Sequence, residues 1–384
     1  MTANKKTIKL ALVHDWLNQI GGAEDVLATL VDMYPGRPVY TSIYAPELMP
    51  DAYQDWDIRT RWIDRMPGIH SRHQPYLPLY PIAWGGLDLS EYDVVLSNKS
   101  GFCHGFHKHE QTLHICYCLA PTRYVWQLDA YIAREGIGCL PALGLRPLVN
   151  WLKRWDYAAA QRVDHFIAIS TEIQERIRTY YDRDSIIIYP PVDTRRFAVR
   201  NVEPEDYFLI VSRLIPYKRI DLAVEAATRL NLPLKIGGRG RDLDRLKALA
   251  GPTVEFLGYV PDDELPELMA RCRAFIFPGL EDFGITPVQA QAAGRPVIAY
   301  GGGGALDTVI PGLSGEHFHE LTVDSLAEVM AAFDDSRYDP EEMRQHAARF
   351  DQAVFQQQID AYIEQAYAVF RTGAPFEWRD PVSI

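Results

Sequence analysis

The stretch A-F-I-F-P-G-L-E-D-F-G-I-T-P-V-Q-A-Q-A-A-G-R-P-V-I-A-Y, from Ala274 to Tyr300, decides the fold of the second half of the chain. It holds two short apolar runs, Ala274 to Phe277 and Pro296 to Tyr300, on either side of a helical pattern from Thr286 to Ala293. Short buried strands that alternate with helices are typical of parallel sheets covered on both faces. The sequence therefore predicts a β-α-β unit whose ligand-binding residues follow the first strand.

The same alternation extends in both directions from this unit. The chain has 384 residues, more than one hydrophobic core usually serves, and a polar stretch from Val192 to Asp206 resembles a linker. We predict an α/β fold with two Rossmann-like, doubly wound domains that face each other across a cleft, residues 1–200 and 201–350, and a helical segment, 351–384, that crosses back to the first domain. Strands are expected at 8–14, 39–44, 93–97, 113–118, 165–170, 186–189, 208–211, 234–237 and 254–257, and helices at 171–181, 220–230, 243–249, 263–270 and 341–370.

Composition narrows the class of protein. The net charge is −12, from 39 basic and 51 acidic residues, which disfavours a nucleic-acid-binding protein because phosphates need a basic face. No apolar run approaches the roughly 20 residues that span a bilayer, and the polar start does not look like a signal peptide. The cysteines are odd in number, fit no zinc spacing, and are expected to be reduced in a cytoplasmic protein: Cys103, Cys116, Cys118, Cys139 and Cys272.

Cations follow two strands of the second domain. Arg213 and Lys218 come after strand 208–211, where they could grip a diphosphate, the arginine as a fork and the lysine as a point charge. Gly238 and Arg239 follow strand 234–237 and suit an anion or a nucleotide, or form an exposed flexible loop.

The loop after strand 274–277 carries Glu281 and Asp282, which could face a sugar nucleotide or act as loop acids beside a helix N-terminus. Thr286 is predicted to be the N-cap of the following helix. Thr286 and Gln289 would then form a capping box, which would explain Gln289 without a ligand. The run Gly301 to Gly304 would let backbone lie close against a flat or charged ligand.

Gly21 and Gly22 open the first helix, where backbone N–H groups could approach an anion or simply make a tight turn. A full dinucleotide fingerprint is missing, and no acid follows the second strand to hold a ribose, so a nicotinamide enzyme is disfavoured. The Asp-x-Asp pairs at 55/57, 182/184 and 242/244 do not directly follow strands. We therefore predict no metal site and no cofactor.

The segment Gly279 to Tyr300 resembles the donor-binding signature of the family-4 retaining glycosyltransferases, which have the GT-B fold. Other motifs resemble the bacterial mannosyltransferase-like branch that builds surface polysaccharides. These are A-L-V-H-D-W-L with Gly21 to Glu24, Y-L-P-L-Y-P at Tyr76 to Pro81, H-I-C-Y-C at His114 to Cys118, and V-S-R-L-x-x-x-K at Val211 to Lys218.

The resemblance implies roles for individual residues. Arg213 and Lys218 would bind the donor diphosphate and Glu281 the hydroxyls of the transferred sugar, which makes these three the catalytic candidates. Further donor-binding candidates are Gly21, Gly22, Gly238, Arg239 and Asp282, the backbone amides of Phe283, Gly284 and Ile285, and Gln289 at the ribose.

Two positions depart from the family pattern. The family usually has glutamate where Gln289 stands, and glutamine accepts a ribose hydrogen bond without charge assistance. The branch usually has His-Thr where this chain has Leu119 and Ala120, so that histidine's role is vacant or filled by another residue. The acceptor-side candidates are His104, Arg123, Tyr124 and Trp126.

The implied function is metal-independent, retaining transfer of a hexose, with mannose from GDP-mannose as the best guess, to a saccharide or lipid-linked saccharide in polysaccharide biosynthesis. The departures leave open an inactive sugar-nucleotide-binding partner subunit, and the fold leaves open a sugar-nucleotide epimerase. The stretch Cys139 to Trp155 mixes aliphatic residues and tryptophans with Arg146, Lys153 and Arg154. It is either a core helix with a solvated edge or a peripheral contact with the cytoplasmic face of the inner membrane.

Overall fold

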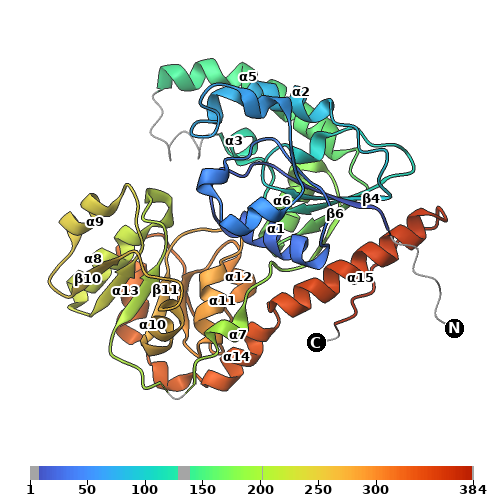
Figure 1. Ribbon diagram of the computed structural model, residues 1–384. Coiled ribbons are helices and arrows are strands. Elements are labelled where there is room, and N and C mark those ends of the chain that lie inside the picture. The colour runs from blue at the N-terminus through green and yellow to red at the C-terminus, as the bar shows by residue number, and fades with distance from the viewer. Residues whose placement is uncertain (1–7, 129–138, 201, 383–384) are drawn as a thin grey trace. The chain divides into compact units, whose positions relative to one another are not determined.

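The computed structural model describes residues 8–128, 139–200 and 202–382, which fold as two compact units (Figure 1). Unit 1 takes the chain up to Tyr189 and again from Phe355, and unit 2 takes Pro190–Val354. The first boundary precedes the predicted residue 200 because helix α7 (Thr194–Phe197) packs on helices α10 (Leu265–Arg271) and α11 (Ile285–Ala292) of unit 2.

The chain enters and leaves unit 2 side by side. The backbone N–H of Val192 donates to the Phe350 carbonyl at 3.0 Å, and the N–H of Gln352 donates to the Val192 carbonyl at 3.0 Å. The entry and exit segments thus pair through backbone hydrogen bonds.

In the described part of unit 1, seven strands form a parallel sheet in the order β3-β2-β1-β4-β5-β6-β7. The order reverses between β1 and β4, as in a doubly wound fold. The central strands β1, β4 and β5 are buried along their whole length, in line with the apolar sequence of β1 and of the first half of β4, whereas Ser97, Asn98 and Lys99 end β4 as buried polar residues. The strands are β1 (Leu10–His14), β2 (Val39–Thr41), β3 (Ile58–Thr60), β4 (Val94–Lys99), β5 (Leu113–Cys118), β6 (His165–Ala168) and β7 (Ser185–Ile187).

Helices complete unit 1. The long ones are α1 (Gly22–Met33), α5 (Cys139–Ala160), α6 (Thr171–Tyr181) and α15 (Gln352–Phe370), of which only α15 begins in unit 2. Shorter ones are α2 (Tyr80–Gly85), α3 (Arg123–Trp126), η1 (Pro46–Leu48), η2 (Asp51–Asp55), η3 (Trp62–Arg65), η4 (Gln74–Leu79) and η5 (Cys103–Gly105).

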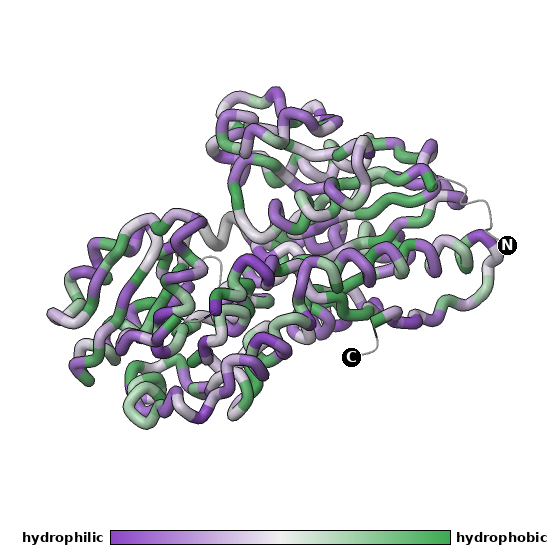
Figure 2. Tube along the Cα trace, turned by 60° about the horizontal axis from the view of Figure 1, so that its bottom comes forward, coloured by the Kyte–Doolittle hydropathy of each residue, from purple (hydrophilic) through white to green (hydrophobic). Residues whose placement is uncertain are grey.

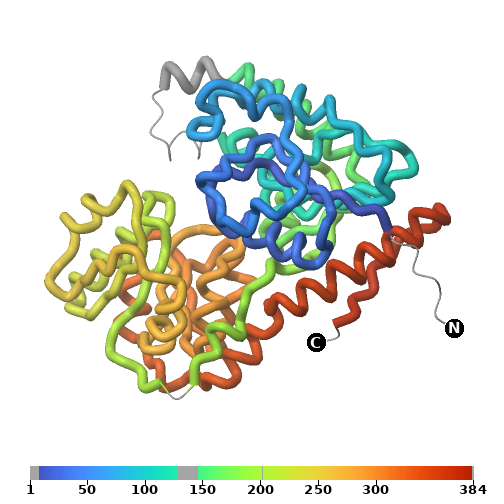
Figure 3. Tube along the Cα trace, in the orientation of Figure 1, coloured from blue at the N-terminus to red at the C-terminus, as the bar shows by residue number. Residues whose placement is uncertain are grey.

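Helix α15 is held by unit 1 and by the tail that follows it. Its Tyr367 hydroxyl donates to Asp93 Oδ1 at 2.9 Å, and Phe355 packs edge-on against Tyr117. The tail turns back beside the helix (Figure 3), where Gln358 Nε2 donates to Asp380 Oδ2 at 2.9 Å. Hydrophilic and hydrophobic residues are interspersed along the helices (Figure 2).

Within the described residues of unit 2, six parallel strands follow the order β10-β9-β8-β11-β12-β13, which reverses between β8 and β11. The strands are β8 (Phe208–Val211), β9 (Leu234–Gly237), β10 (Val254–Gly258), β11 (Ala274–Phe277), β12 (Val297–Tyr300) and β13 (Gly315–Phe318). The remaining helices are η6 (Pro216–Lys218), α8 (Ile220–Leu230), α9 (Leu243–Leu249), α12 (Ala305–Thr308), α13 (Val323–Ala332), η7 (Asp335–Arg337) and α14 (Pro340–Ala348). The two sheets confirm the predicted GT-B fold of two Rossmann-like domains.

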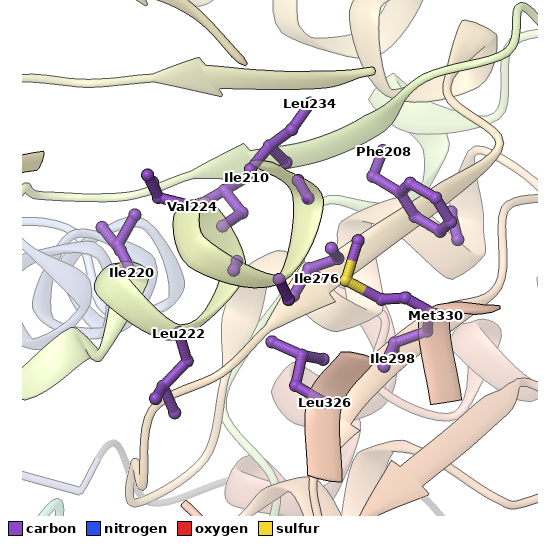
Figure 4. Packing of buried hydrophobic residues seen from close by; sticks show 14 of the residues in the cluster. Phe208, Ile210, Ile220, Leu222, Val224, Leu234, Ile276, Ile298, Leu326 and Met330 are labelled. Carbon is purple, nitrogen blue, oxygen red and sulfur yellow. The ribbon is translucent and has the colours of Figure 1, made fainter. Parts of the chain in front are cut away.

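Helices α8 and α13 pack together on one face of this sheet (Figure 4). Val224 of α8 and Met330 of α13 are buried against Ile210 of β8 and Ile276 of β11. This apolar layer fixes β8 and β11 side by side, and with them the loops that follow both strands.

The capping box predicted at Thr286 and Gln289 is wrong. Helix α11 starts at Ile285 after Gly284, whose φ of 100° suits glycine, so Thr286 lies inside the helix and cannot be its N-cap. Helix α6 has the predicted bounds, Thr171–Tyr181, and is capped by Ser170, whose hydroxyl accepts from the Ile173 N–H at 3.2 Å.

The described helices include none that is long and apolar enough to cross a membrane. The described cysteine side chains, Cys103, Cys116, Cys118 and Cys272, are buried free thiols, and the side chain of Cys139 lies outside the described residues.

Candidate functional site

The point where the strand order reverses in unit 2 brings Lys218 and Glu281 together. Lys218 ends η6 after β8, and Glu281 lies in the loop after the neighbouring β11. Lys218 Nζ forms an ion pair with Glu281 Oε1, and both side chains are mostly buried, at 14% and 20% exposed. Ligands of doubly wound sheets bind outside the carboxyl ends of the strands at such a reversal.

Arg213 adds a second cation beside Lys218. Its side chain is exposed, and Nη2 donates to the Tyr217 hydroxyl at 3.4 Å. Lys218 Nζ lies 5.5 Å from the centroid of the Tyr217 ring. Tyr217 thus contacts both cations, and the guanidinium keeps N–H donors in solvent for an anion.

The loop after β9 packs against the loop that carries Arg213. A Cβ atom at Gly238 would lie 1.9 Å from the Ser212 carbonyl oxygen, and the Leu214 N–H donates to the Arg239 carbonyl at 2.9 Å. Gly238 is therefore required for close backbone packing. Arg239 is exposed and lies 5.3 Å from the ring centroid of Tyr259.

A chain of charged side chains, which the sequence analysis missed, ties these loops together. Arg219, in a left-handed conformation, donates from Nε to Asp221 Oδ1 at 3.2 Å. Arg245 lies 3.9 Å from Asp221 and donates from Nε to the buried Asp242 at 2.7 Å. Only the Arg245–Asp221 contact joins two elements, α9 and α8, and a contact between residues 24 positions apart leaves no signal in the sequence.

The remaining donor-side candidates cluster at the start of α11. Asp282 and Phe283 are buried, while Gly284, Ile285 and Gln289 are partly exposed. The N-cap residue of this helix is Gly284, which has no side chain to cap it, and helix N-termini are positions that suit anions. Gln289 lies one turn after Ile285 and on the same helix face.

The glycine run packs on protein. Cβ atoms at Gly303 and Gly304 would lie 2.2 Å from the Glu281 carbonyl oxygen and 2.2 Å from the Phe283 Cα. A Cβ atom at Gly302 would lie 2.7 Å from the Tyr300 ring, and one at Gly301 3.2 Å from His319. The glycines of this run are therefore explained by close packing against neighbouring segments, chiefly the Glu281 loop. Contact of the run with a ligand stays a prediction.

Unit 1 has its own glycine turn at the carboxyl end of β1. Gly21 caps α1 in an extended conformation, and Gly22 is the first helical residue. The buried Glu24 carboxylate turns back toward this turn, with Oε1 3.5 Å from His14 Nε2. A Cβ atom at Gly21 would lie 3.4 Å from Glu24 Oε2, so an acid of the chain itself borders the candidate anion position.

The acceptor-side prediction for His104 is wrong. This side chain has no exposed surface, and burial lowers the pKa of its imidazole well below the usual value. Its Nε2 lies 3.5 Å from Asp156 Oδ1 in the interior of unit 1. His104 therefore packs as a neutral core residue, which a single sequence does not distinguish from a surface one.

Asp156, which the sequence analysis also missed, organises the segment that carries the other acceptor-side candidates. It accepts from Trp126 Nε1 at 2.6 Å, from the Tyr181 hydroxyl at 2.7 Å and from the Thr122 hydroxyl at 3.1 Å. Lys99, equally buried, donates to the Ala120 carbonyl at 3.3 Å. The sequence did contain one sign of this role, because Asp156 is an acidic residue on a helix that is otherwise rich in apolar residues.

Trp126 is partly exposed and stacks on Tyr180 with centroids 4.9 Å apart. Arg123 and Tyr124 are also partly exposed on α3, and the Tyr124 ring lies 6.4 Å from that of Trp16. These three side chains remain candidates for the acceptor side.

Among residues 8–128, 139–200 and 202–382, no three His, Cys, Asp or Glu side chains are grouped to hold a metal ion. Of the Asp-x-Asp pairs, Asp57 binds Arg59 at 2.8 Å and Asp242 binds Arg245. Metal independence stays a prediction.

Comparison with known proteins extends this description. Several curated relatives match parts of the chain, two of which are mannosyltransferases described as follows. The GDP-mannose-dependent α-(1-6)-phosphatidylinositol monomannoside mannosyltransferase of Mycolicibacterium smegmatis is 32% identical over 166 residues, 36% of this chain and 44% of that protein. O-antigen chain mannosyltransferase B of Escherichia coli is 34% identical over 107 residues, 24% of this chain and 28% of that protein. The chain thus spans less than half the length of these relatives.

Among solved structures, the crystal structure of Anabaena Alr3699/HepE in complex with UDP superposes with a TM-score of 0.66. The two sequences are 18% identical, and the alignment covers 93% of this chain and 100% of the Anabaena chain. This similarity supports the fold alone.

Two family models match consecutive parts of the sequence. The model described as Glycosyltransferase Family 4 matches residues 20–196, and the model described as Glycosyl transferases group 1 matches residues 191–350. The chain therefore belongs to the glycosyltransferases of the GT-B fold, with a family 4 domain followed by a group 1 domain.

Proposed function

We propose that the chain is a retaining, metal-independent hexosyltransferase that uses a nucleotide-diphosphate sugar as donor. The observation that carries this proposal is the contact between Lys218 and Glu281, beside the exposed Arg213, at the strand reversal of unit 2. A cationic pair suits a diphosphate, and an adjacent carboxylate suits sugar hydroxyls. Few other ligands need both groups side by side.

In this reaction the bond between sugar C1 and the phosphate oxygen breaks, and a bond from C1 to an acceptor hydroxyl oxygen forms on the same face. The acceptor proton passes to the departing phosphate. Arg213, Lys218 and the N-terminus of α11 stabilise the charge that grows on the diphosphate. Each such group contributes on the order of 2–4 kcal/mol to lowering the barrier.

GDP-mannose is the donor we propose, because mannosyltransferases are among the relatives and one is named as GDP-mannose-dependent. The proposed acceptor is a saccharide or lipid-linked saccharide in polysaccharide biosynthesis at the cytoplasmic face of the membrane, in line with the O-antigen relative. Arg239 and Gln289 complete the donor site, and Arg123, Tyr124 and Trp126 face the acceptor.

A thermal-shift screen of the full chain with GDP-, UDP- and dTDP-sugars tests the donor, since a ligand that binds only the folded state raises Tm. We expect GDP-mannose to give the largest shift and release of GDP to accompany transfer. Donor binding with no turnover under any condition would instead identify an inactive partner subunit. Isomerisation of the donor without an acceptor would identify an epimerase.

Glu281→Ala should lower the rate of transfer by about 100-fold or more, because a contact that strengthens in the transition state is lost. GDP binding, which depends on Arg213 and Lys218, should stay within about threefold by calorimetry, within the 1 kcal/mol spread of neutral changes. Asp324→Ala, at a side chain 88% exposed on α13, is the control. Equal loss of GDP binding and transfer would contradict the role given to Glu281.

A further inference from the structure

The loop that carries Glu281 is enclosed by backbone on both sides. On the β8 side, a Cβ atom at Gly279 would lie 2.9 Å from the Lys218 carbonyl oxygen. On the β12 side, a Cβ atom at Gly303 would lie 2.2 Å from the Glu281 carbonyl oxygen. Real Cβ atoms do not approach other atoms so closely, so any side chain at Gly303 must displace the loop.

A hydrogen bond fixes the same contact. The Gly304 N–H donates to the Glu281 carbonyl at 2.8 Å, and a Cβ atom at Gly304 would lie 2.2 Å from the Phe283 Cα. The Glu281 main chain is thus anchored by the glycine run on one side, while its side chain is anchored by Lys218 on the other. The main chain and the side chain of Glu281 are thus held from the segments that follow β12 and β8, the two strands that flank β11.

We propose that Gly303 is a positioning residue that sets the location of the Glu281 carboxylate relative to Lys218, and so holds the transferred hexose in register with the diphosphate. The inference rests on the proposed function. It assigns Gly303 no contact with the donor. A shift of about 1 Å in such a group costs on the order of 100-fold in rate, so a methyl group at this position is a severe test.

Backbone conformation has to be separated from the contact, because Gly303 has a φ of 61°. Gly312 provides the matched control. Its φ is 78°, and a Cβ atom there would meet nothing within 4 Å. Gly303→Ala and Gly312→Ala therefore share the backbone strain, and only the first displaces the Glu281 loop.

The experiment measures three quantities on the full-length wild type and on both variants: Kd for GDP, Kd for GDP-mannose, and the rate of GDP release from GDP-mannose. We expect Gly303→Ala to lower the rate by about 100-fold and to remove any advantage of GDP-mannose over GDP in affinity. GDP affinity should stay within about threefold. Gly312→Ala should match the wild type in all three.

The inference would be overturned if Gly303→Ala and Gly312→Ala had the same rate of GDP release and the same ratio of Kd for GDP to Kd for GDP-mannose. A wild type that neither prefers GDP-mannose to GDP nor releases GDP from it refutes the proposed donor instead. In that case the same comparison uses the nucleotide sugar that gives the largest thermal shift. If Gly303→Ala does not fold, Gly279→Ala approaches the loop from the Lys218 side at 2.9 Å and should give a smaller loss of the same kind.

Discussion

Lys99 and Asp156 place opposite charges in the interior of unit 1, where neither side chain has exposed surface. Burial by itself lowers the pKa of the Lys99 ammonium, but the nearby charge of Asp156 contributes most to a net rise. Their hydrogen bonds converge on Ala120, Thr122 and Trp126, in the segment with the acceptor-side candidates. The pair therefore fixes that segment at the cost of burying two charges.

Asp156→Asn should lower the free energy of unfolding by about 3–5 kcal/mol, because it leaves the Lys99 ammonium buried without a counter-charge. Urea denaturation followed by circular dichroism measures this. The double variant Lys99→Met/Asp156→Leu should recover much of the loss, since it removes both charges. A single variant within 1 kcal/mol of the wild type would show that the ammonium does not depend on Asp156.

At the level of residues, the sequence predicted the cations and the carboxylate of the site because each directly follows a strand. Arg213, Lys218 and Glu281 needed only the rule that parallel strands end at one edge. His104 and Asp156 could not be assigned in this way. They are 52 positions apart, and their meeting depends on how α5 packs on η5.

At the level of elements, the two strands that were missed both lie at sheet edges, although the edge strands β7 and β10 were predicted. β3 (I-R-T) and β13 (G-E-H-F) carry too few apolar residues to stand out, because one side of each lacks a partner strand in the sheet. The start of α11 was predicted one residue too late, because several residues in succession favour capping and only the backbone conformation decides among them.

Helix α5 presents different faces to the core and to solvent. Among its described side chains, Val149, Leu152 and Asp156 are buried. Trp151 is 45% exposed and Tyr157 40% exposed, with exposed Arg146 and Arg154 nearby in sequence. We propose that this outer face contacts an anionic membrane surface, since aromatic and basic side chains suit the headgroup region.

Flotation with vesicles of phosphatidylglycerol and phosphatidylcholine tests this face. Trp151→Ser/Arg154→Ser should reduce the bound fraction several-fold, because each basic residue near an anionic surface contributes about 1 kcal/mol. Arg229→Ser/Tyr259→Ser changes an arginine and an aromatic residue at exposed positions of unit 2 and should bind as the wild type does. Equal binding by all three proteins would remove the membrane contact from the proposal.

At the level of the whole molecule, burial lowers the pKa of several histidines below their usual value of about 6.5. Of these, His104 and His114 in unit 1 have at most 1% exposed surface. A lowered folded-state pKa means that the unfolded chain takes up protons first as pH falls. The stabilisation that neutral, buried histidines contribute is therefore present above pH 6.5 and is lost below it.

The free energy of unfolding should accordingly decrease from pH 7.5 to pH 5.5, by about 1 kcal/mol for each fully buried histidine. Urea titrations at a series of pH values measure the slope. His104→Phe should flatten it, because the residue no longer takes up a proton in the unfolded state. A stability that stays constant over this range would contradict the buried, neutral state of these side chains.

The sequence predicted two domains, but the boundary after the first one lies at Tyr189 instead of residue 200. Residues 190–199 join unit 2 because α7 packs on α10 and α11, an association that a polar linker sequence does not reveal. The sequence also gave no sign that Val192 pairs with the segment around Phe350, since nothing local links positions so far apart.

Unit 2 is an insertion into unit 1, and its first and last segments are hydrogen-bonded to each other through Val192, Phe350 and Gln352. Two chain segments therefore connect the units, so that a protease that cut one of them would leave the units covalently joined through the other. Because unit 2 occupies one contiguous stretch of the sequence, Pro190–Val354, exchange of that stretch alone would replace the whole unit and leave the sequence of unit 1 unchanged.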